Sequence, residues 1–340
     1  MITLGIETSC DETSVAIIKN GELTANLISS QDFHKKYGGV VPELSSRAHL
    51  QIINPLLKEA LRISGVTLND VNLIGATAGP GLIGALLVGL TFAKGLAMSL
   101  NKEFVAVNHI EGHIFSGFLM PDKPEFPFIC LVVSGGHSLL IYVKSYTELI
   151  KLGTTIDDAA GEAFDKVSKL LGLGYPGGPH IQNTALSGDE NRIKFPISDL
   201  GNTFNFSFSG LKTSVLRYIQ NQGGVEKLDE QHISDIAASF QKALIKALII
   251  KLELALKEFK VNSISVVGGV AANNYLKQEA TNLAESYKKK IVIPSLEFCG
   301  DNAAMIAYRA ETLYKNGVKH KLNFKPFPSL SDNSFLTFEQ

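Results

Sequence analysis

The sequence predicts an α/β protein built from two halves that share one plan. Two observations support this prediction: short apolar runs of strand length alternate with longer segments of helical spacing, and the order of these segments recurs from residue 126 onward. A chain of 340 residues has room for two domains or one large two-lobed domain. Hydrophobic residues make up 45% and charged residues 19%, which is typical of a folded globular protein.

The first half is predicted to contain three strands, a helix, a further strand and a second helix. Residues 2–7 read ITLGIE, and after a polar turn residues 14–19 read SVAIIK. Asn20-Gly21 then predicts a tight hairpin into the third strand, because both residue types accept positive φ. A helix is expected over 42–63 and a strand over 72–78, NLIGATA, before the helix that follows Gly79-Pro80-Gly81.

The second half repeats this order. Strands are predicted at FPFICLVV (126–133), SLLIYVK (138–144) and TELIKLG (147–153), followed by a helix over 159–171. Later segments predict a long helix, the strand SISVV and helices near 273–286 and 301–315; the apolar face of the long helix comprises Ile233, Ile236, Ala237, Phe240, Leu244, Ala247 and Leu248. A stretch rich in Gly, Pro, Asn and Ser around 174–210 is expected to be an ordered binding loop, since it also contains aromatic and apolar residues.

Composition also restricts compartment and partners. The apolar run 82–100 approaches membrane-spanning length, but Lys94 and several glycines interrupt it, which favours a buried helix. The opening residues lack the features of a signal peptide, and the three cysteines form no CxxC pair, so we expect a cytoplasmic protein. A net charge of −1 and a pI near 6.7 give no global attraction to nucleic acid. Local basic clusters lie at 34–36, 288–290 and 314–327. Such charge runs are usually solvent-exposed faces, and this interpretation is favoured for each, but they are also the places where a polyanion could bind.

The segment VNHIEGHIFSG places His109 and His113 four residues apart. On a helix the two side chains differ by about 40° in direction, with Cβ atoms ~5–6 Å apart, so they can share one metal ion. Glu111 lies about 200° from His109, pointing away. In the zinc-peptidase motif HExxH the glutamate directly follows the first histidine, so HIEGH lacks the base of that motif. The pair by itself fits a metal site and two hydrogen-bonded helix histidines equally well.

Asp301, in FCGDNAAMIA, is the candidate third ligand. Two histidines and one carboxylate leave positions open for water or substrate, and this donor set suits Fe(II) and Zn(II) equally. An aspartate just before an alanine-rich helix is also an ordinary N-cap, so this structural interpretation stays open.

Turns that contain glycine follow several apolar strands. These are residues 7–13, Ser134-Gly135-Gly136-His137 and VVGGVAANNYL at 266–276, and the helix start after Gly79-Pro80-Gly81 is similar. Exposed amides in such turns can hold phosphate, although each turn alone has an ordinary structural explanation. In the acidic segment 157–165, Asp165 is the best candidate to bind a ribose or substrate hydroxyl, because the earlier aspartates favour a helix start.

These motifs closely resemble the TsaD family (also called Gcp or YgjD), the tRNA threonylcarbamoyladenosine transferases, in its bacterial form. The resemblance covers nearly the whole chain up to about residue 317. It runs through LGIETSCDETSVAI, GGVVPELSSRAH, TAGPGLIGALLVG, VNHIEGH, LVVSGGHSLL, IDDAAGEAFDKVSKLLGLGYPGGP, FSFSGLKT, GGVAANNYL and FCGDNAAMIA. Two small departures are Ser45, where the family commonly has alanine, and Tyr308-Arg309 after AMIA.

The resemblance implies a duplicated actin-like, sugar-kinase-like fold with a ligand cleft between two lobes. The lobes would comprise residues 1–108 with 300–340, and residues 109–299. The resemblance also implies one divalent metal ion, with Fe(II) favoured over Zn(II), held by His109, His113 and Asp301. The residues implied to bind threonylcarbamoyl-AMP are Val132, Val133, Ser134, Gly135, Gly136, Asp165, Gly178 and Asn273.

The implied reaction transfers the threonylcarbamoyl group to the exocyclic amine of the adenosine next to the anticodon, in tRNAs that read ANN codons, and releases AMP. Asp11 and Glu12 are candidates for orienting or deprotonating this amine. The implied partners are tRNA, a TsaB-like paralogue and a TsaE-like ATPase, with a TsaC-like synthase supplying the substrate and ATP used by the wider pathway. Alternative functions are an ATP-dependent kinase or ATPase of the same fold, a metallopeptidase and a tRNA-binding subunit without catalytic activity.

Overall fold

The computed structural model describes residues 1–37 and 39–330, which form two compact units. Unit 1 comprises Met1–Lys123, Ser145–Leu149 and the chain from Pro294 onward, and unit 2 comprises Pro124–Lys144 and Ile150–Ile293. Each unit contains a five-stranded sheet, in the orders β3-β2-β1-β4-β5 and β10-β9-β6-β7-β8. In both sheets a central strand has an antiparallel neighbour on one side and a parallel neighbour on the other, which confirms the predicted duplication.

The division into lobes implied by the resemblance stays a prediction. In the structure the helix α3 (His109–Ser116) belongs to unit 1, whereas the prediction placed residue 109 at the start of the second lobe. The three implied metal ligands therefore all lie in unit 1.

The sheet of unit 1 forms from the strands predicted in the first half and from one additional strand. The turn between β2 and β3 has positive φ at Asn20 (54°) and Gly21 (88°), as the hairpin signal required. The additional strand is β5, whose apolar run had not been assigned. The strands are β1 (Ile2–Glu7), β2 (Glu12–Lys19), β3 (Glu22–Ser30), β4 (Leu73–Gly79) and β5 (Glu103–Asn108).

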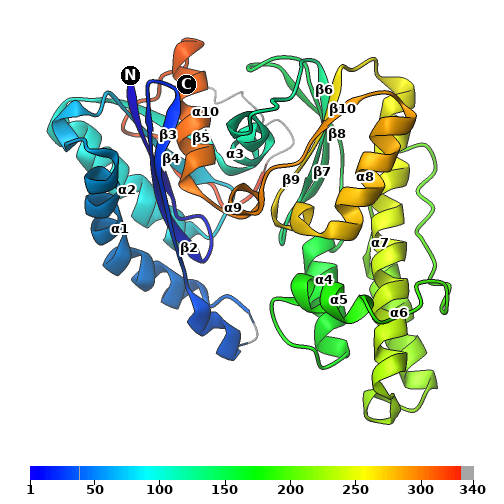
Figure 1. Cartoon of the computed structure of the whole chain (residues 1–340). Helices are drawn as coiled ribbons and strands as arrows, with labels where there is room; N and C mark the ends of the chain where they lie inside the picture. The colour runs from blue at the N-terminus through cyan, green and yellow to red at the C-terminus, as the bar shows by residue number, and fades with distance from the viewer. Residues whose placement is uncertain (38, 331–340) are drawn as a thin grey trace. The chain divides into compact units, whose positions relative to one another are not determined.

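Helices cover both faces of this sheet (Figure 1). Helices α1 (Pro42–Ser64) and α2 (Ile83–Leu100) lie on one face, and α10 (Ala303–Lys315) lies on the other with α3 against it. Among the described residues, α2 alone is long and apolar enough to cross a membrane by length and composition. It is a partly buried core helix, as expected. Its buried residues are Ala85, Leu86, Gly89, Leu90, Ala93 and Ala97. The short helices of this unit are η1 (Asp32–Tyr37), η2 (Leu68–Asp70), η3 (Gly117–Leu119) and α9 (Leu296–Cys299).

Helix α10 lies unusually close to the sheet. A Cβ atom at Gly5 would be 2.7 Å from Ala307 N and closer still to Ala303 O, and one at Gly75 would overlap the Ala310 Cβ. Glycine at these two strand positions lets the helix backbone approach β1 and β4 directly. This approach brings Asp301, just before α10, toward the strand ends.

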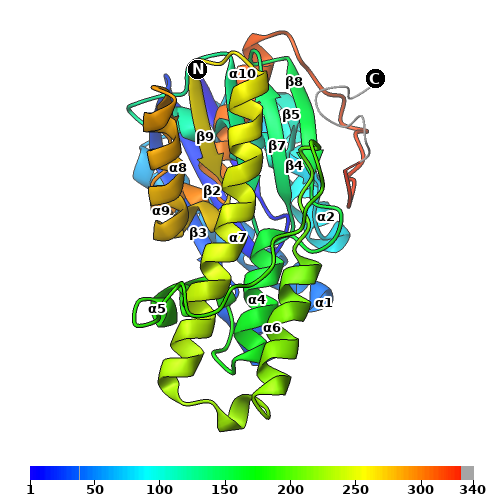
Figure 2. The same ribbon diagram turned by 90° about the vertical axis from the view of Figure 1, so that its right-hand side faces the viewer.

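The sheet of unit 2 forms from the strands predicted in the second half and from the short β10. The strands are β6 (Phe128–Val133), β7 (Ser138–Val143), β8 (Leu149–Thr154), β9 (Ser263–Val267) and β10 (Lys290–Val292). Figure 2 shows α7 running along the sheet and past the strand ends to α4, α5 and α6. The helices are α4 (Ala160–Leu170), α5 (Gly177–Ala185), α6 (Ser209–Asn221), η4 (Val225–Lys227), α7 (Glu230–Glu258), η5 (Gly269–Ala272) and α8 (Asn274–Ser286).

The stretch expected as one binding loop, residues 174–210, is only partly a loop. Helix α5 lies inside it, and α6 begins at its end. Residues 186–208 contain no helix or strand and are tied to the unit by the bridge between Thr155 and Phe206. The prediction of an ordered segment is therefore correct, whereas the prediction of a continuous loop is wrong.

A buried ion pair joins α3 to α10. Glu111 Oε2 accepts hydrogen bonds from Arg309 Nε at 2.8 Å and Nη2 at 2.6 Å, and both side chains are fully buried. Arg309 also donates to the Tyr146 carbonyl oxygen and stacks over the Phe115 ring at 4.2 Å. Glu111 therefore points away from the histidines beside it, as its helical position predicts, and fixes α3 on α10.

We predict that Arg309→Met lowers the free energy of unfolding by about 3–5 kcal/mol, because Glu111 would be left buried without its counterion. The double variant with Glu111→Met should recover most of this loss, since no charge then stays buried. The measurement is urea denaturation followed by circular dichroism, because the chain has no tryptophan. Arg47→Met, which breaks a surface pair with Glu43, is the control and should change stability by less than about 1 kcal/mol. Wild-type stability in Arg309→Met would contradict this role of the pair.

Candidate metal and substrate site

The ends of three parallel strands meet at one edge of the unit 1 sheet. Strands β1, β4 and β5 end at Glu7, Gly79 and Asn108, and His109 follows directly as the first residue of α3. Asn108 caps this helix, because its side-chain oxygen accepts from the amides of Ile110 and Glu111. Ligand sites of open α/β sheets commonly lie at this edge.

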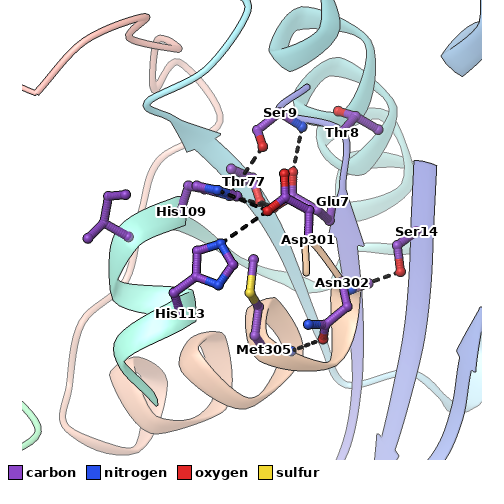
Figure 3. Close-up of polar contacts among 12 residues, drawn as sticks. Glu7, Thr8, Ser9, Ser14, Thr77, His109, His113, Asp301, Asn302 and Met305 are labelled. Atoms are coloured by element: carbon purple, nitrogen blue, oxygen red, sulfur yellow. Dashed lines mark hydrogen bonds and ion pairs between the residues drawn. The ribbon is translucent and has the colours of Figure 1, made fainter. Parts of the chain in front are cut away.

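Two histidines and one aspartate converge there (Figure 3). His113 Nε2 lies 3.1 Å and His109 Nε2 lies 3.4 Å from the same oxygen, Asp301 Oδ1. The imidazole rings are 4.7 Å apart and nearly perpendicular. The three side chains offer ligand atoms within 4.8 Å of one another. The structure thus brings together the three residues that the resemblance implied.

Asp301 is free for this role because another residue caps α10. The N-cap is Asn302, whose side-chain oxygen accepts from Met305 N at 3.0 Å. The interpretation of Asp301 as an ordinary helix cap is therefore wrong.

Glu7 holds His109 from the other side. This carboxylate is fully buried at the end of β1, and its Oε2 lies 3.1 Å from His109 Nδ1. It also accepts from Thr77 Oγ1 and Ser9 N, each at 2.5 Å. A carboxylate on the far nitrogen of a ligating histidine is a common feature of metal sites. Sequence analysis did not assign this role to Glu7, and its place at a buried strand end was the available signal.

Charges in this cluster stabilise one another. Burial alone would lower the pKa of His109, but Asp301 and Glu7 hold it well above its ordinary value. Burial would likewise raise the pKa of Asp301, but His109 and His113 hold it well below its usual range. The carboxylates are therefore ionised, and His109 carries a proton that a cation would have to displace on binding.

The arrangement fits one small divalent cation. Ligand atoms at about 2.1 Å from a tetrahedral ion lie about 3.4 Å apart, close to the separations found here. His113 Nδ1 is buried and has no hydrogen-bond partner in the part of the chain that the structure describes. His113 thus meets a polar partner only through Nε2, on the side of Asp301.

Asp11 lies in the turn between β1 and β2, and Glu12 directly after it is the first residue of β2, in the same unit. Burial, together with the nearby charges of Asp301 and Asp11, raises the pKa of Glu12 to about 10. The Asp11 carbonyl oxygen accepts a hydrogen bond from Gln31 N, which holds the turn. The Cys10 carbonyl oxygen and the Thr13 hydroxyl both contact the buried ring of His49.

The residues predicted to bind the nucleotide-like substrate gather in unit 2. Strands β6 and β9 are parallel neighbours, so the turns that follow them, at 134–137 and 268–273, lie at one sheet edge. Ser134 closes the first turn: its amide donates to His137 O at 2.8 Å, and its carbonyl oxygen accepts from Gly161 N at the start of α4. Gly268 approaches Val133 closely enough to exclude a side chain.

Hydrogen bonds extend this group to α5 and α8. Asp165 on α4 accepts from Gly177 N at 2.6 Å, and Gly178 is the next residue of α5. Gln182 on α5 accepts from the amide of Asn274 at 2.6 Å. Asn273 caps α8 and donates to Gln241 Oε1, so its amide has structural partners as well.

The turn at Gly79-Pro80-Gly81 is different. Gly81 N donates to Pro328 O and Leu82 N donates to Ser9 O, so these amides are occupied by the chain itself. The structure supports an ordinary tight turn at this position rather than a phosphate cradle.

Solved structures with similar folds are distant in sequence. They include HypF of T. kodakarensis, with a TM-score of 0.65 and 18% identity over 93% of this chain and 48% of that one. Component A of (R)-2-hydroxyglutaryl-CoA dehydratase from Acidaminococcus fermentans matches with a TM-score of 0.54 and 16% identity, over 94% of this chain and 100% of that one. These similarities show the actin-like fold that the sequence resemblance implied.

Similarity in sequence is much closer. The chain is 50% identical to the tRNA N6-adenosine threonylcarbamoyltransferase of Thermosipho africanus over 334 residues, 97% of this chain and 99% of that one. It is 46% identical to the protein of the same description from Symbiobacterium thermophilum, over 97% and 96% of the two chains. The family model TsaD, described as tRNA N6-adenosine threonylcarbamoyltransferase, matches residues 22–308. The chain therefore belongs to the TsaD family, and its activity is the formation of threonylcarbamoyladenosine in tRNA.

Proposed function

We propose that this activity uses threonylcarbamoyl-AMP as donor and the adenosine next to the anticodon of ANN-reading tRNAs as acceptor, with one divalent cation at His109, His113 and Asp301. The metal assignment rests on one observation: the Nε2 atoms of His109 and His113 both approach the same oxygen of Asp301, while Glu7 contacts the other ring nitrogen of His109. The donor set suits Fe(II) and Zn(II) equally, and we propose Fe(II), with Zn(II) as the alternative, on the resemblance to the family. We propose a cytoplasmic location.

The transfer is an acyl substitution. The exocyclic amine of adenosine attacks the carbamoyl carbon, the bond from that carbon to the phosphate oxygen breaks, AMP leaves, and the amine loses one proton. The bound cation supplies Lewis-acid stabilisation of phosphate or carbonyl oxygens. The backbone amides of Gly135 and Gly136 are proposed to stabilise the oxyanion that develops on the carbonyl, since the Ser134 amide already donates to His137 O.

Residues of unit 2 are proposed to hold the donor. Val132, Val133, Ser134, Gly135 and Gly136 supply the turn that contacts the adenylate. Asp165, Gly178 and Asn273 complete the set, with the Asp165 carboxylate accepting from a ribose or threonyl hydroxyl. Gly135, Gly136 and Gly178 have open space where a Cβ would stand, which suits close contact with a ligand.

The two carboxylates of the first turn are proposed to have different roles. Glu12 holds a proton at neutral pH when its pKa is near 10, so it orients the acceptor by donating a hydrogen bond. Asp11 is then the proposed acceptor of the proton from the amine. A cation on Asp301 would offset one of the charges that keep Glu12 protonated.

A metallopeptidase is disfavoured by the position of Glu111. This carboxylate is buried against Arg309 and turned away from the histidines, so it cannot act as a base on water at the cation. Glycoprotein cleavage by the metal-loaded protein would reinstate that alternative.

The first prediction concerns the metal. His109→Ala should lose bound iron or zinc, measured by elemental analysis, and should lower label transfer from threonine to tRNA by at least about 100-fold, since one ligand of three is removed. The assay contains the synthase, bicarbonate, ATP and the companion proteins. His232→Ala, an exposed histidine of α7, is the control and should behave as wild type. Full metal content in His109→Ala would reject the proposed ligand set.

The second prediction separates Asp11 from Glu12. Asp11→Asn should lower kcat by roughly 10²–10⁴-fold, the usual contribution of a general base. Glu12→Gln should cost less than about 10-fold, because a neutral amide replaces a protonated carboxyl of the same shape. Single-turnover transfer at saturating tRNA measures both. A greater loss in Glu12→Gln than in Asp11→Asn would reverse the two roles.

The third prediction concerns partners. The net charge of −1 gives this chain little attraction for a polyanion, so tRNA docking is proposed to need a TsaB-like paralogue and a TsaE-like ATPase. Omitting both should reduce transfer from preformed threonylcarbamoyl-AMP at least about 10-fold, to an extent that grows with salt concentration. An isolated chain that works at full rate would show that the dependence is wrong.

A further inference from the structure

A buried histidine lies beside the turn that carries Asp11 and Glu12. His49 of α1 is fully buried, and its Nδ1 lies 2.8 Å from Thr13 Oγ1. Its Nε2 lies 3.0 Å from the carbonyl oxygen of Cys10. One imidazole therefore contacts both ends of the four-residue segment that begins at Cys10 and ends at Thr13.

The partners of His49 fix its protonation. Burial lowers the pKa of His49, more than the hydrogen bond to Cys10 and the charges of Glu7 and Asp11 raise it, so the ring is neutral at pH 7. Nε2 also lies 3.1 Å from Ser45 Oγ and 3.5 Å from Gln31 Nε2. A carbonyl oxygen can only accept, so we assign the hydrogen to Nε2, which donates it to Cys10 O at the shortest of these distances. Nδ1 is then an acceptor, and the Thr13 hydroxyl donates to it.

Further side chains hold the same end of the turn. Ser45, one turn before His49 on α1, also donates to Cys10 O. Gln31 donates to the Ser45 carbonyl oxygen at 3.3 Å, and its Oε1 lies 2.9 Å from Nε2 of His34. Sequence analysis placed His34 in a basic surface cluster, but it is buried. Ser45 supplies a hydrogen bond that the alanine common in the family cannot make.

We propose that His49, in its neutral Nε2–H form, is a positioning residue for threonylcarbamoyl transfer: by holding Cys10 O and Thr13 Oγ1 together it fixes the backbone at Asp11 and Glu12. This inference rests on the proposed roles of those two carboxylates. In the part of the chain that the structure describes, the hydrogen-bond contacts of His49 are with Cys10, Thr13, Ser45 and Gln31 and not with the three metal ligands, so it acts by holding the turn in place. A displacement of about 1 Å in a catalytic group can cost roughly 100-fold in rate.

The test compares His49→Phe, which keeps an aromatic ring of similar shape without hydrogen bonds, with His49→Gln, whose amide nitrogen can still donate to Cys10 O. His49→Phe should lower kcat by roughly 10- to 100-fold with KM for threonylcarbamoyl-AMP changed less than about threefold. Metal content should stay at the wild-type value. His49→Gln should recover at least part of the lost rate, and His232→Phe is the matched control for the substitution itself.

The protonation is measured separately. In a nuclear magnetic resonance spectrum of protein with ¹⁵N-labelled histidine, the signal that disappears in His49→Gln belongs to His49. This signal should have the chemical shifts of a neutral ring with its hydrogen on Nε2. If His49→Phe does not fold, Thr13→Val removes one of the two contacts and should lower kcat in the same direction with unchanged KM.

The outcomes distinguish this inference from the proposed function. Loss of rate in Asp11→Asn with a fully active His49→Phe overturns the positioning role and leaves the proposed function intact. Full activity in both Asp11→Asn and Glu12→Gln rejects the assigned carboxylate roles, and this inference with them. A loss in His49→Phe that comes with loss of metal and no recovery in His49→Gln, or a ring protonated on Nδ1, also overturns it.

Discussion

The buried carboxylate of Glu7 is the constraint on which the arrangement of unit 1 depends. A charged group without solvent is tolerated only when hydrogen bonds and counter-charges replace water. Glu7 obtains these from Ser9 N, Thr77 Oγ1 and His109, which come from the ends of three different strands or their following turns. Satisfying one carboxylate therefore aligns β1, β4 and the start of α3. The same contact turns the His109 ring so that its other nitrogen faces Asp301.

A second buried pair sets the position of Asp301. The contact between Glu111 and Arg309 joins the helix that carries the histidines to the helix that follows the aspartate. Gly5 lets α10 approach the sheet, and Asn302 rather than Asp301 caps α10. Two of the three ligands are consequently held on α3, and Asp301 lies in the short connection directly before α10, which the ion pair joins to α3. Supporting elements fixed in this way give a well-defined coordination geometry.

The sequence predicted the elements whose periodicity is strong and the ligands whose spacing is local. The histidine pair is a local feature, because residues four apart on any helix face the same side. The place of Glu7 at a buried strand end pointed to a functional role, but its partners could not be predicted, since they come from three strand ends that are distant in sequence. Helix α5 was missed because Gly177-Gly178-Pro179 opens it, and such residues are ordinary signals for a loop. The choice between Asp301 and Asn302 as the helix cap is decided by tertiary contacts with His109 and His113.

Four acidic side chains, Glu7, Asp11, Glu12 and Asp301, influence one another in this part of unit 1. Two histidines, and the Ser9 amide and Thr77 hydroxyl that donate to Glu7, offset only part of this charge. Burial is the largest cause of the raised pKa of Glu12, and the remaining repulsion adds to it. A proton on Glu12 and a cation at Asp301 both relieve this repulsion, so a bound cation lowers the pKa of Glu12 without removing burial, the largest cause that raises it. The number of protons held in the turn and the charge held at the triad are therefore coupled. His49 contacts the same turn through hydrogen bonds, and because burial lowers its pKa, it adds no further positive charge to this group at pH 7.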